Sequence, residues 1–210
     1  MCWFSRLNKA TLIGSTLVVT LSLVAALAPY IAPYDPTEIH PLDRFSGPSA
    51  KYLLGTDFYG RDILSRIIYG LRTSLQISSL SVLLAALGGV SLGVLAGYFP
   101  WLDNLIMRVM DVMFAFPVLL LAITIVAILG PGKFSAILAI AIVYVPIFAR
   151  VARGPTLAVR EETYVEAAQA LGASHWRIIA KHVLPNITFP YRSSSNSLYS
   201  WRRPSSSNRP

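Results

Sequence analysis

The sequence is poor in charged residues. Lys, Arg, Asp and Glu make up 13% of its 210 residues, about half of the roughly 25% typical of soluble domains. A helix needs about 20 apolar residues to cross a bilayer, and side chains such as Arg150 and Arg153 can lengthen a short apolar stretch by reaching back to the interface. The sequence therefore predicts four membrane-spanning helices. They lie in the four stretches without charge, 10–34, 73–102, 112–132 and 134–149.

Residues that carry chemistry are also scarce. The single cysteine, Cys2, excludes an internal disulfide and a cysteine-based metal cluster. The stretch GPGKF at 130–134 lacks the glycine spacing and the Ser or Thr of an ATP-binding Walker A motif. His175 and His182 share one predicted helix face, where we expect interfacial histidines and not a metal pair. We therefore expect no catalysis, no metal and no cofactor in this chain; a membrane-embedded enzyme would need ionisable residues inside its spans.

The net charge of +8 is explained by basic residues in loops, which set membrane topology, and we expect no nucleic-acid partner. Arg6 and Lys9 predict a cytoplasmic N-terminus. The first span resembles a signal peptide, but Pro29 and the length of the apolar run favour an uncleaved anchor. The chain then has an external segment, about 32–72, and the basic region that begins near Arg150 returns to the cytoplasm.

Small residues and prolines punctuate the predicted spans. Four small residues at four-residue spacing predict a ridge that another helix can approach closely: Ala85, Gly89, Gly93 and Gly97. Pro117 and Pro146 predict kinks, which either line a path or are merely tolerated by packing.

Two short stretches are predicted to be turns between spans. PWLDN at 100–104 is predicted to be a turn on the inner side, and GPGK at 130–133 a tight turn on the outer side. Arg108 and Asp111 lie three residues apart, and we expect them to form an ion pair near the interface.

A polar stretch follows the fourth span: TYVEAAQALGASHWRIIAKHVLPN, residues 163–186. It predicts a helix over 161–170 whose first turn holds Glu161 and Glu162, and a left-handed Gly172 just past its end. Ser174 is expected to cap a second helix that stops before Pro185. The predicted apolar faces follow helical spacing: Tyr164, Ala167, Ala168 and Leu171, then Trp176, Ile179, Ala180 and Val183. Such a surface either docks a partner or rests on lipid.

The same stretch resembles the EAA loop of ABC-importer permeases. The matching positions are Glu166, Ala167, Ala168, Gly172, Leu184 and Pro185, while His182 stands where the family pattern has Ile. The resemblance implies that this loop is a coupling helix, which docks in a groove of a cytoplasmic ATPase subunit and transmits its closure to the membrane helices.

A second motif, LGTDFYGRDILSRIIYGLRTSL at 54–75, is similar to the segment before the second span in permeases of oligopeptide, dipeptide and nickel importers. The match is carried by Gly55, Thr56, Asp57, Gly60, Arg61, Asp62, Ser65, Arg66, Gly70, Arg72 and Ser74. Among them, Asp57, Arg61 and Asp62 are close enough to pair, and the first two glycines suit turns. These residues either order the external segment or contact a substrate-delivering binding protein.

The resemblance implies an all-α, polytopic protein with the type I ABC importer permease fold, of whose usual six spans four are present. It implies a multi-pass protein of the bacterial inner membrane that imports peptides by alternating access. Its partners would be a second permease subunit, two cytoplasmic ATPase subunits that bind ATP, an external binding protein and membrane lipid. Alternatives are a nickel or glutathione importer permease, a membrane scaffold and a non-functional truncated remnant.

The predicted organisation has three parts. Residues 1–72 form an anchor span and external segment, and 73–186 form the permease core with its coupling loop, about 153–186. Residues 187–210 form a tail rich in Ser and Arg. We expect the reading frame to be lost near Asn186; a disordered tail is the alternative.

Overall fold

The computed structural model describes residues 9–188, so Arg6 and nearly all of the Ser- and Arg-rich tail lie outside the described residues. All elements of regular secondary structure within 9–188 are helices. The single β-bridge described there pairs Thr56 with Asp62. The predicted all-α class is therefore confirmed. Within this range three helices are long and apolar enough to cross a membrane, or four if a bent pair forms one span.

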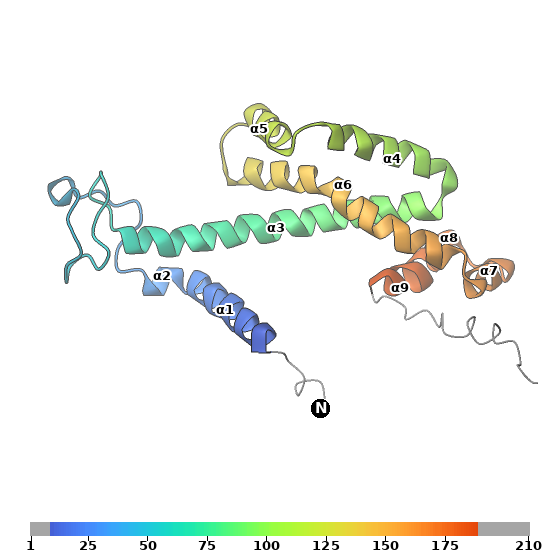
Figure 1. Cartoon of the computed structure of the whole chain (residues 1–210), viewed down its shortest axis with the longest axis horizontal. Helices are drawn as coiled ribbons and strands as arrows, with labels where there is room; N and C mark the ends of the chain where they lie inside the picture. Colours follow the sequence, from blue (N-terminus) through green and yellow to red (C-terminus); the bar gives the residue numbers. More distant parts are fainter. Residues whose placement is uncertain (1–8, 189–210) are drawn as a thin grey trace, which may run out of the picture. The chain divides into compact units, whose positions relative to one another are not determined.

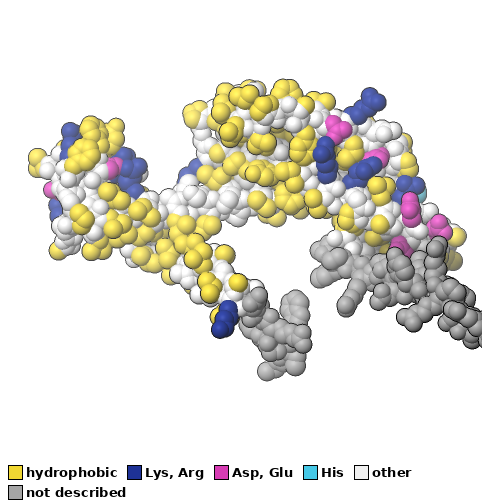
Figure 2. Space-filling model, viewed as in Figure 1, with side chains coloured by type: hydrophobic (Ala, Val, Ile, Leu, Met, Phe, Trp, Pro, Cys, Tyr) yellow, Lys and Arg dark blue, Asp and Glu magenta, His cyan; other side chains and the backbone are white. Residues whose placement is uncertain are grey.

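The chain divides into two compact units, one of residues 1–84 and 122–141, the other of residues 85–121 and 142–210. The first unit begins with α1 (Lys9–Ala26) and α2 (Ala28–Ile31). The predicted first span is thus broken at Leu27, next to Pro29 in the first turn of α2. Along α1 only Ala25 is buried, and Figure 2 shows the hydrophobic side chains that cover this helix. An outward apolar surface suits lipid, because the helix satisfies its own backbone.

Two long helices, α3 (Ile63–Tyr98) and α6 (Lys133–Arg160), run parallel to each other. In the first unit Ser81 donates a hydrogen bond to the carbonyl of Ile137, 56 residues later. In the second unit Gly89 lies against Val145 and Gly93 against Ala149, at the same offset. A constant positive offset means that both helices run in the same direction, so their C-terminal ends meet (Figure 1).

The predicted small-residue ridge is confirmed within the second unit. A Cβ atom added to Gly93 would lie 2.3 Å from the carbonyl oxygen of Ala149, and one added to Gly97 would lie 2.7 Å from Cβ of Thr156. Ala85 is fully buried. Only residues without large side chains allow two backbones to approach this closely.

The predicted third span, 112–132, covers the end of α4 (Pro100–Ala115) and all of α5 (Val118–Leu129), a pair bent by 96°. The break lies at Phe116, whose ψ of 136° is extended, because a residue before proline disfavours the helical conformation. The predicted kink at Pro117 is thus confirmed as a full break. By contrast, α6 continues through Pro146 as a single helix. Val145, the residue before this proline, is held by its packing against Gly89.

The prediction of a turn at 100–104 is wrong, because these residues form the first turn of α4. The chain changes direction at Phe99 alone, which is extended, and Pro100 occupies the first helical position. Proline suits this position, since its fixed φ is already helical and its missing N–H has no partner to lose there.

Candidate functional site

The polar stretch after α6 folds as four short helical segments in the second unit. They are α7 (Thr163–Ala170), α8 (His175–Ile178), the π-helix η3 (Ile179–Val183) and α9 (Leu184–Thr188). Within this stretch, we call residues 163–186 the EAA loop.

Two predicted boundaries of the EAA loop are wrong. Glu162 is extended and precedes α7, so Glu166 is the acidic residue of the first turn. The second helical run does not stop before Pro185 but continues through it in α9. The wider turns of η3 explain this, because a π-helix shifts the backbone hydrogen bonds by one residue and helps to accommodate a missing N–H.

One side of the EAA loop is packed against the ends of α3 and α6. Val165, Ile178 and Val183 are fully buried in a cluster with Tyr98 and Val159. The predicted apolar faces are therefore only partly right. Ile179 and Val183 are buried and Ala168 packs beside the cluster, whereas the exposed members are Tyr164, Ala167, Leu171, Trp176 and Ala180. Helical periodicity identifies the apolar side chains of the EAA loop, but it does not indicate which of them pack against α3.

The residues that match the EAA pattern lie mainly on the opposite, exposed side. Ala168 is half-buried, while the exposed positions are Glu166, Ala167, Gly172, Leu184 and Pro185. Leu171 is 88% exposed and Trp176 is 69% exposed, so large apolar side chains accompany them. Asn186 connects the two ends of the loop, because its Nδ2 donates to Oη of Tyr164 at 3.0 Å.

Gly172 produces the turn between α7 and α8. Its φ is +78°, a conformation that favours glycine. Its N–H donates to the carbonyl of Gln169 at 2.9 Å, and the N–H of Ala173 donates to the carbonyl of Ala168 at 3.1 Å. These bonds satisfy carbonyls that the end of α7 leaves free. The predicted left-handed glycine is confirmed, and the turn holds Leu171 at the tip.

A polar contact that the sequence did not indicate connects the EAA loop to α3. Oη of Tyr98 lies 2.9 Å from Nδ1 of His175, and Nε2 of Gln169 donates to the same oxygen at 3.4 Å. The rings of Phe99 and His175 also meet edge to face, with centroids 5.7 Å apart. His182 lies instead beside the ring of Tyr164, so the two predicted interfacial histidines have different neighbours.

Two ion pairs join α4 to α6, and Figure 2 shows charged side chains gathered over these helices. Arg153 donates from Nε and Nη2 to the two carboxylate oxygens of Asp103, at 2.5 and 2.6 Å. Such two-pronged contacts are stronger than single bonds. Arg150 donates to Asp111 at 2.6 Å, so the partner of this aspartate is on α6 and is not the predicted Arg108. Pairing between helices cannot be deduced from spacing along one helix.

The second predicted site, in the external segment, is organised around Asp57. Its carboxylate accepts hydrogen bonds from the backbone N–H of Tyr59 at 2.8 Å and from Nε of Arg61 at 2.9 Å, and it pairs with Arg66. The predicted pair of Asp57 and Arg61 is confirmed. Partial burial opposes ionisation, but the hydrogen bonds from Arg61 and from two backbone amides outweigh it and lower the pKa of Asp57 to about 2. This carboxylate is therefore ionised at neutral pH.

Other residues of the external motif stabilise turns and loops of the backbone. Gly55 and Gly60 have φ of +80° and +76°, as expected for turns. Asp62 is buried and does not join the ion pair; its Oδ2 accepts the N–H of Ser65 at 2.8 Å, at the start of α3. Thr56 is also buried, and its hydroxyl accepts the N–H of Ser46 at 3.0 Å.

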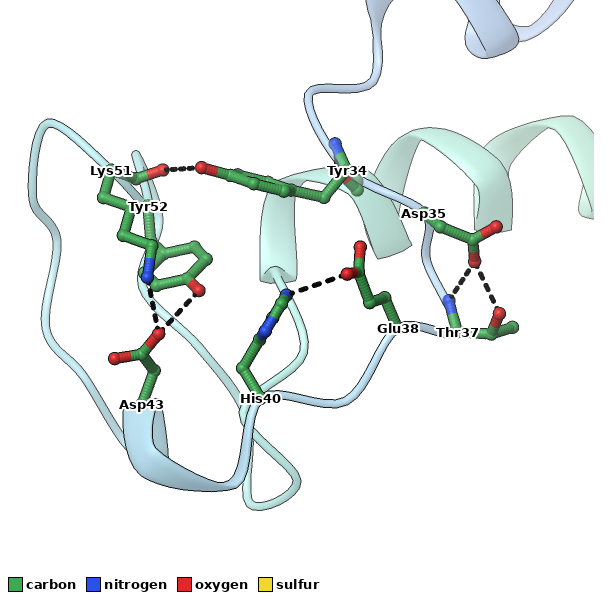
Figure 3. A network of polar contacts seen from close by, with 9 residues as sticks. Tyr34, Asp35, Thr37, Glu38, His40, Asp43, Lys51 and Tyr52 are labelled. Atoms are coloured by element: carbon green, nitrogen blue, oxygen red, sulfur yellow. Dashed lines mark hydrogen bonds and ion pairs between the residues drawn. The ribbon is translucent and has the colours of Figure 1, made fainter.

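A neighbouring network, shown in Figure 3, was not indicated by the sequence. Asp43, at the end of the 3₁₀ helix η2 (Pro41–Asp43), accepts bonds from Nζ of Lys51 at 2.7 Å and Oη of Tyr52 at 2.8 Å. The bond from Lys51, followed by the bond from Tyr52, lowers the pKa of Asp43. Nε2 of His40 lies 3.5 Å from Glu38. These contacts order the external segment.

Comparison with known proteins identifies the class of the chain. Residues 89–193 match the family described as binding-protein-dependent transport system inner membrane component, and residues 6–48 match the N-terminal transmembrane domain of oligopeptide transport permease C. The chain therefore belongs to the binding-protein-dependent transport system inner membrane component family. This is a family of membrane permeases and not of catalytic enzymes.

Individual relatives agree with this family. The chain is 46% identical over 184 residues to the dipeptide transport system permease protein DppC of Alkalihalophilus pseudofirmus, covering 87% of this chain and 60% of the relative. It is 44% identical over 186 residues to the glutathione transport system permease protein GsiD of Pectobacterium atrosepticum, covering 87% and 62%. For DppC of Haemophilus influenzae the identity is 42% over 196 residues, covering 90% and 66%. The chain thus spans less than two thirds of the length of these relatives.

Proposed function

We propose that the chain is a permease subunit of an ABC importer that moves peptides across a bacterial inner membrane. Its family membership and its apolar helices support a membrane transport component. Two of the relatives described above are named as dipeptide permeases. ATP binding and hydrolysis then belong to separate cytoplasmic subunits, and the chain works beside a second permease subunit.

The observation that carries this proposal is the two-sided structure of the EAA loop. One side is fixed to the ends of α3 and α6 by buried residues such as Val165 and Ile178. The other side presents Glu166, Gly172 and the highly exposed Leu171. A surface that combines large apolar side chains with a fixed charge is typical of a protein interface. We assign this exposed side to the groove of an ATPase subunit.

The parallel course of α3 and α6 supports a cytoplasmic EAA loop. Both helices end on the same side, and α3 starts from the external segment if the N-terminus is cytoplasmic. The end of α6 and the EAA loop contain five basic residues, Arg150, Arg153, Arg160, Arg177 and Lys181, which favours the cytoplasmic side.

The external segment is proposed to face the binding protein that delivers the substrate. Asp57, Arg61 and Arg66 form a charged group there, with Arg66 the most exposed of the three. Glutathione is the second candidate substrate, because a relative of similar identity is a glutathione permease; it is itself a small peptide. A nickel importer remains the third member of this group.

The proposal is tested by co-expressing the chain with the ATPase subunits of a related dipeptide importer and measuring how much ATPase is retained on the purified chain. We expect Glu166→Arg to reduce retention by reversing an exposed charge. Gly172→Pro should reduce it by breaking the turn, because proline cannot adopt a φ of +78°. Glu161→Arg is the matched control, since it reverses an exposed charge just before α7. Equal retention by all three variants and the parent chain would refute the docking site.

A further inference from the structure

Tyr98 is the last residue of α3, and its side chain is only 4% exposed. Its hydroxyl contacts the EAA loop on both sides of the Gly172 turn. His175 lies after the turn, with Nδ1 at 2.9 Å, and Gln169 lies before it, with Nε2 at 3.4 Å. One oxygen atom of α3 therefore holds both α7 and α8.

The hydroxyl of Tyr98 can serve both neighbours at once. With the Gln169 amide oriented as in the structure, its nitrogen can only donate, so the hydroxyl oxygen of Tyr98 accepts that bond. The same hydroxyl still has its hydrogen and a second lone pair, so it donates to Nδ1 of His175 or accepts from it according to the tautomer of the imidazole.

The rest of the contact between the EAA loop and α3 is apolar. Val94 of α3 meets Val165, Ile178 and Val183 in one cluster. Apolar burial is roughly proportional to area and has no direction, so these side chains hold the loop against α3 without fixing its angle. A hydrogen bond depends on direction and weakens steeply when it is bent.

Tyr98 is itself firmly held. The preceding residue, Gly97, packs so closely against α6 that a Cβ atom added to it would lie 2.7 Å from Cβ of Thr156. The EAA loop is thus attached to the helices at two points, through the chain at the end of α6 and through the hydroxyl of Tyr98. The chain connection alone lets the loop rotate about the end of α6, whereas the second attachment restricts it to orientations that keep His175 and Gln169 beside the hydroxyl of Tyr98.

We infer that Tyr98 is a positioning residue, whose hydroxyl sets the orientation of the EAA loop and transmits its movement to α3. The orienting role follows from the contacts of this chain alone. The transmitting role rests on the proposed docking of an ATPase subunit. The two roles can therefore be tested separately.

The orienting role is tested by measuring a distance within the second unit. Cysteines replace Leu105 of α4 and Leu171 at the loop tip, which are 62% and 88% exposed, in a chain that carries Cys2→Ser. Spin labels on them report a distance distribution in lipid nanodiscs. We expect Tyr98→Phe to widen and shift this distribution, because it removes the hydroxyl but keeps the ring packed on Phe99.

Two further variants separate orientation from general damage. Tyr164→Phe also removes a hydroxyl, but its bond to Asn186 lies within the EAA loop, so the distribution should stay as in the parent chain. His175→Asn places an amide oxygen near the position of Nδ1 and should preserve the distribution, whereas His175→Leu should widen it. If Tyr98→Phe does not fold, the two His175 variants test the same hydrogen bond by changing its other partner.

Retention of the ATPase is then measured on the same variants. An unchanged distribution in both Tyr98→Phe and His175→Leu would overturn the positioning role, as would equal widening in Tyr164→Phe. If Tyr98→Phe widens the distribution while the parent chain retains no ATPase, the orienting role stands and the proposed function fails. If the parent retains the ATPase and Tyr98→Phe widens the distribution and lowers retention, both are supported.

Discussion

Replacing Gly93 by alanine tests the close contact between α3 and α6 in the second unit. A Cβ atom at this position would lie 2.3 Å from the carbonyl oxygen of Ala149 and 2.9 Å from Cβ of Ala152. Neither neighbour can rotate away, because one is backbone and the other is the first atom of a side chain. The substitution must therefore move the two helices apart.

The size of the effect follows from two opposing contributions. Ordinary contacts of a Cβ atom begin at 3.4 Å, so the backbones must separate by about 1 Å and lose dispersion contacts on both sides. Overpacking of this kind costs about 1–3 kcal/mol. Alanine offsets about 0.5–1 kcal/mol of this, because glycine is less favourable inside a helix. Taking the middle of each range, we expect a net loss of about 1 kcal/mol in the free energy of unfolding.

Gly88→Ala is the matched control, since it lies on the same helix and its added Cβ would meet a side-chain atom of Val145 at an ordinary 3.6 Å. Thermal unfolding of the purified chain in detergent is the assay, and 1 kcal/mol corresponds to a shift of about 2–4 °C in Tm for a chain of this size. We expect Gly93→Ala to melt below the parent and Gly88→Ala to melt at or above it. Equal Tm values for the two variants would refute the close helix contact.

Four other substitutions have defined expectations. Gly60→Ala should disorder the external segment, because its Cβ atom would lie 1.9 Å from the carbonyl oxygen of His40; limited proteolysis measures this. The site of Gly172→Ala has open space around the added Cβ atom. This variant should lose only about 1–2 kcal/mol in the free energy of unfolding, because alanine is strained in the left-handed conformation. Asp57→Asn should lower the Tm at pH 7 but not near pH 2. The pKa of this carboxylate is about 2 in the folded chain, below the usual 3.8. Its stabilisation is therefore complete above the pKa of the unfolded chain and disappears as the pH falls through the pKa of the folded chain. Arg153→Lys should lower the Tm by the equivalent of about 1 kcal/mol, because one of its two charged hydrogen bonds is lost; an unchanged Tm would mean that the ion pair is not formed.

Local rules account for the parts of the structure that were predicted from the sequence. The charge-free windows located the apolar helices, because the bilayer requires length and apolarity before anything else. Four-residue spacing of glycines predicted the ridge of α3, since that spacing places them on one helix face. The left-handed turn at Gly172 and the pair of Asp57 and Arg61 depend on residues close in sequence, and both were found.

Several of the incorrect predictions concern contacts between distant segments. The stripe of the EAA loop that is buried depends on where α3 ends, so Val165 is buried while Tyr164 is exposed. Asp111 pairs with a residue 39 positions later, and Tyr98 meets a histidine 77 positions later. No periodicity along one helix contains this information.

The parallel course of α3 and α6 constrains the segment between them. Two consecutive spans that run in the same direction require the intervening chain to return across the membrane. The 12 residues of α5 rise about 18 Å, which is less than the roughly 30 Å of a hydrocarbon core. Part of α4 must therefore contribute to the crossing, although α4 and α5 are separated at Phe116 and Pro117. We therefore predict that the bent pair α4–α5 forms one broken span, whose exposed backbone at the break is covered by protein or water.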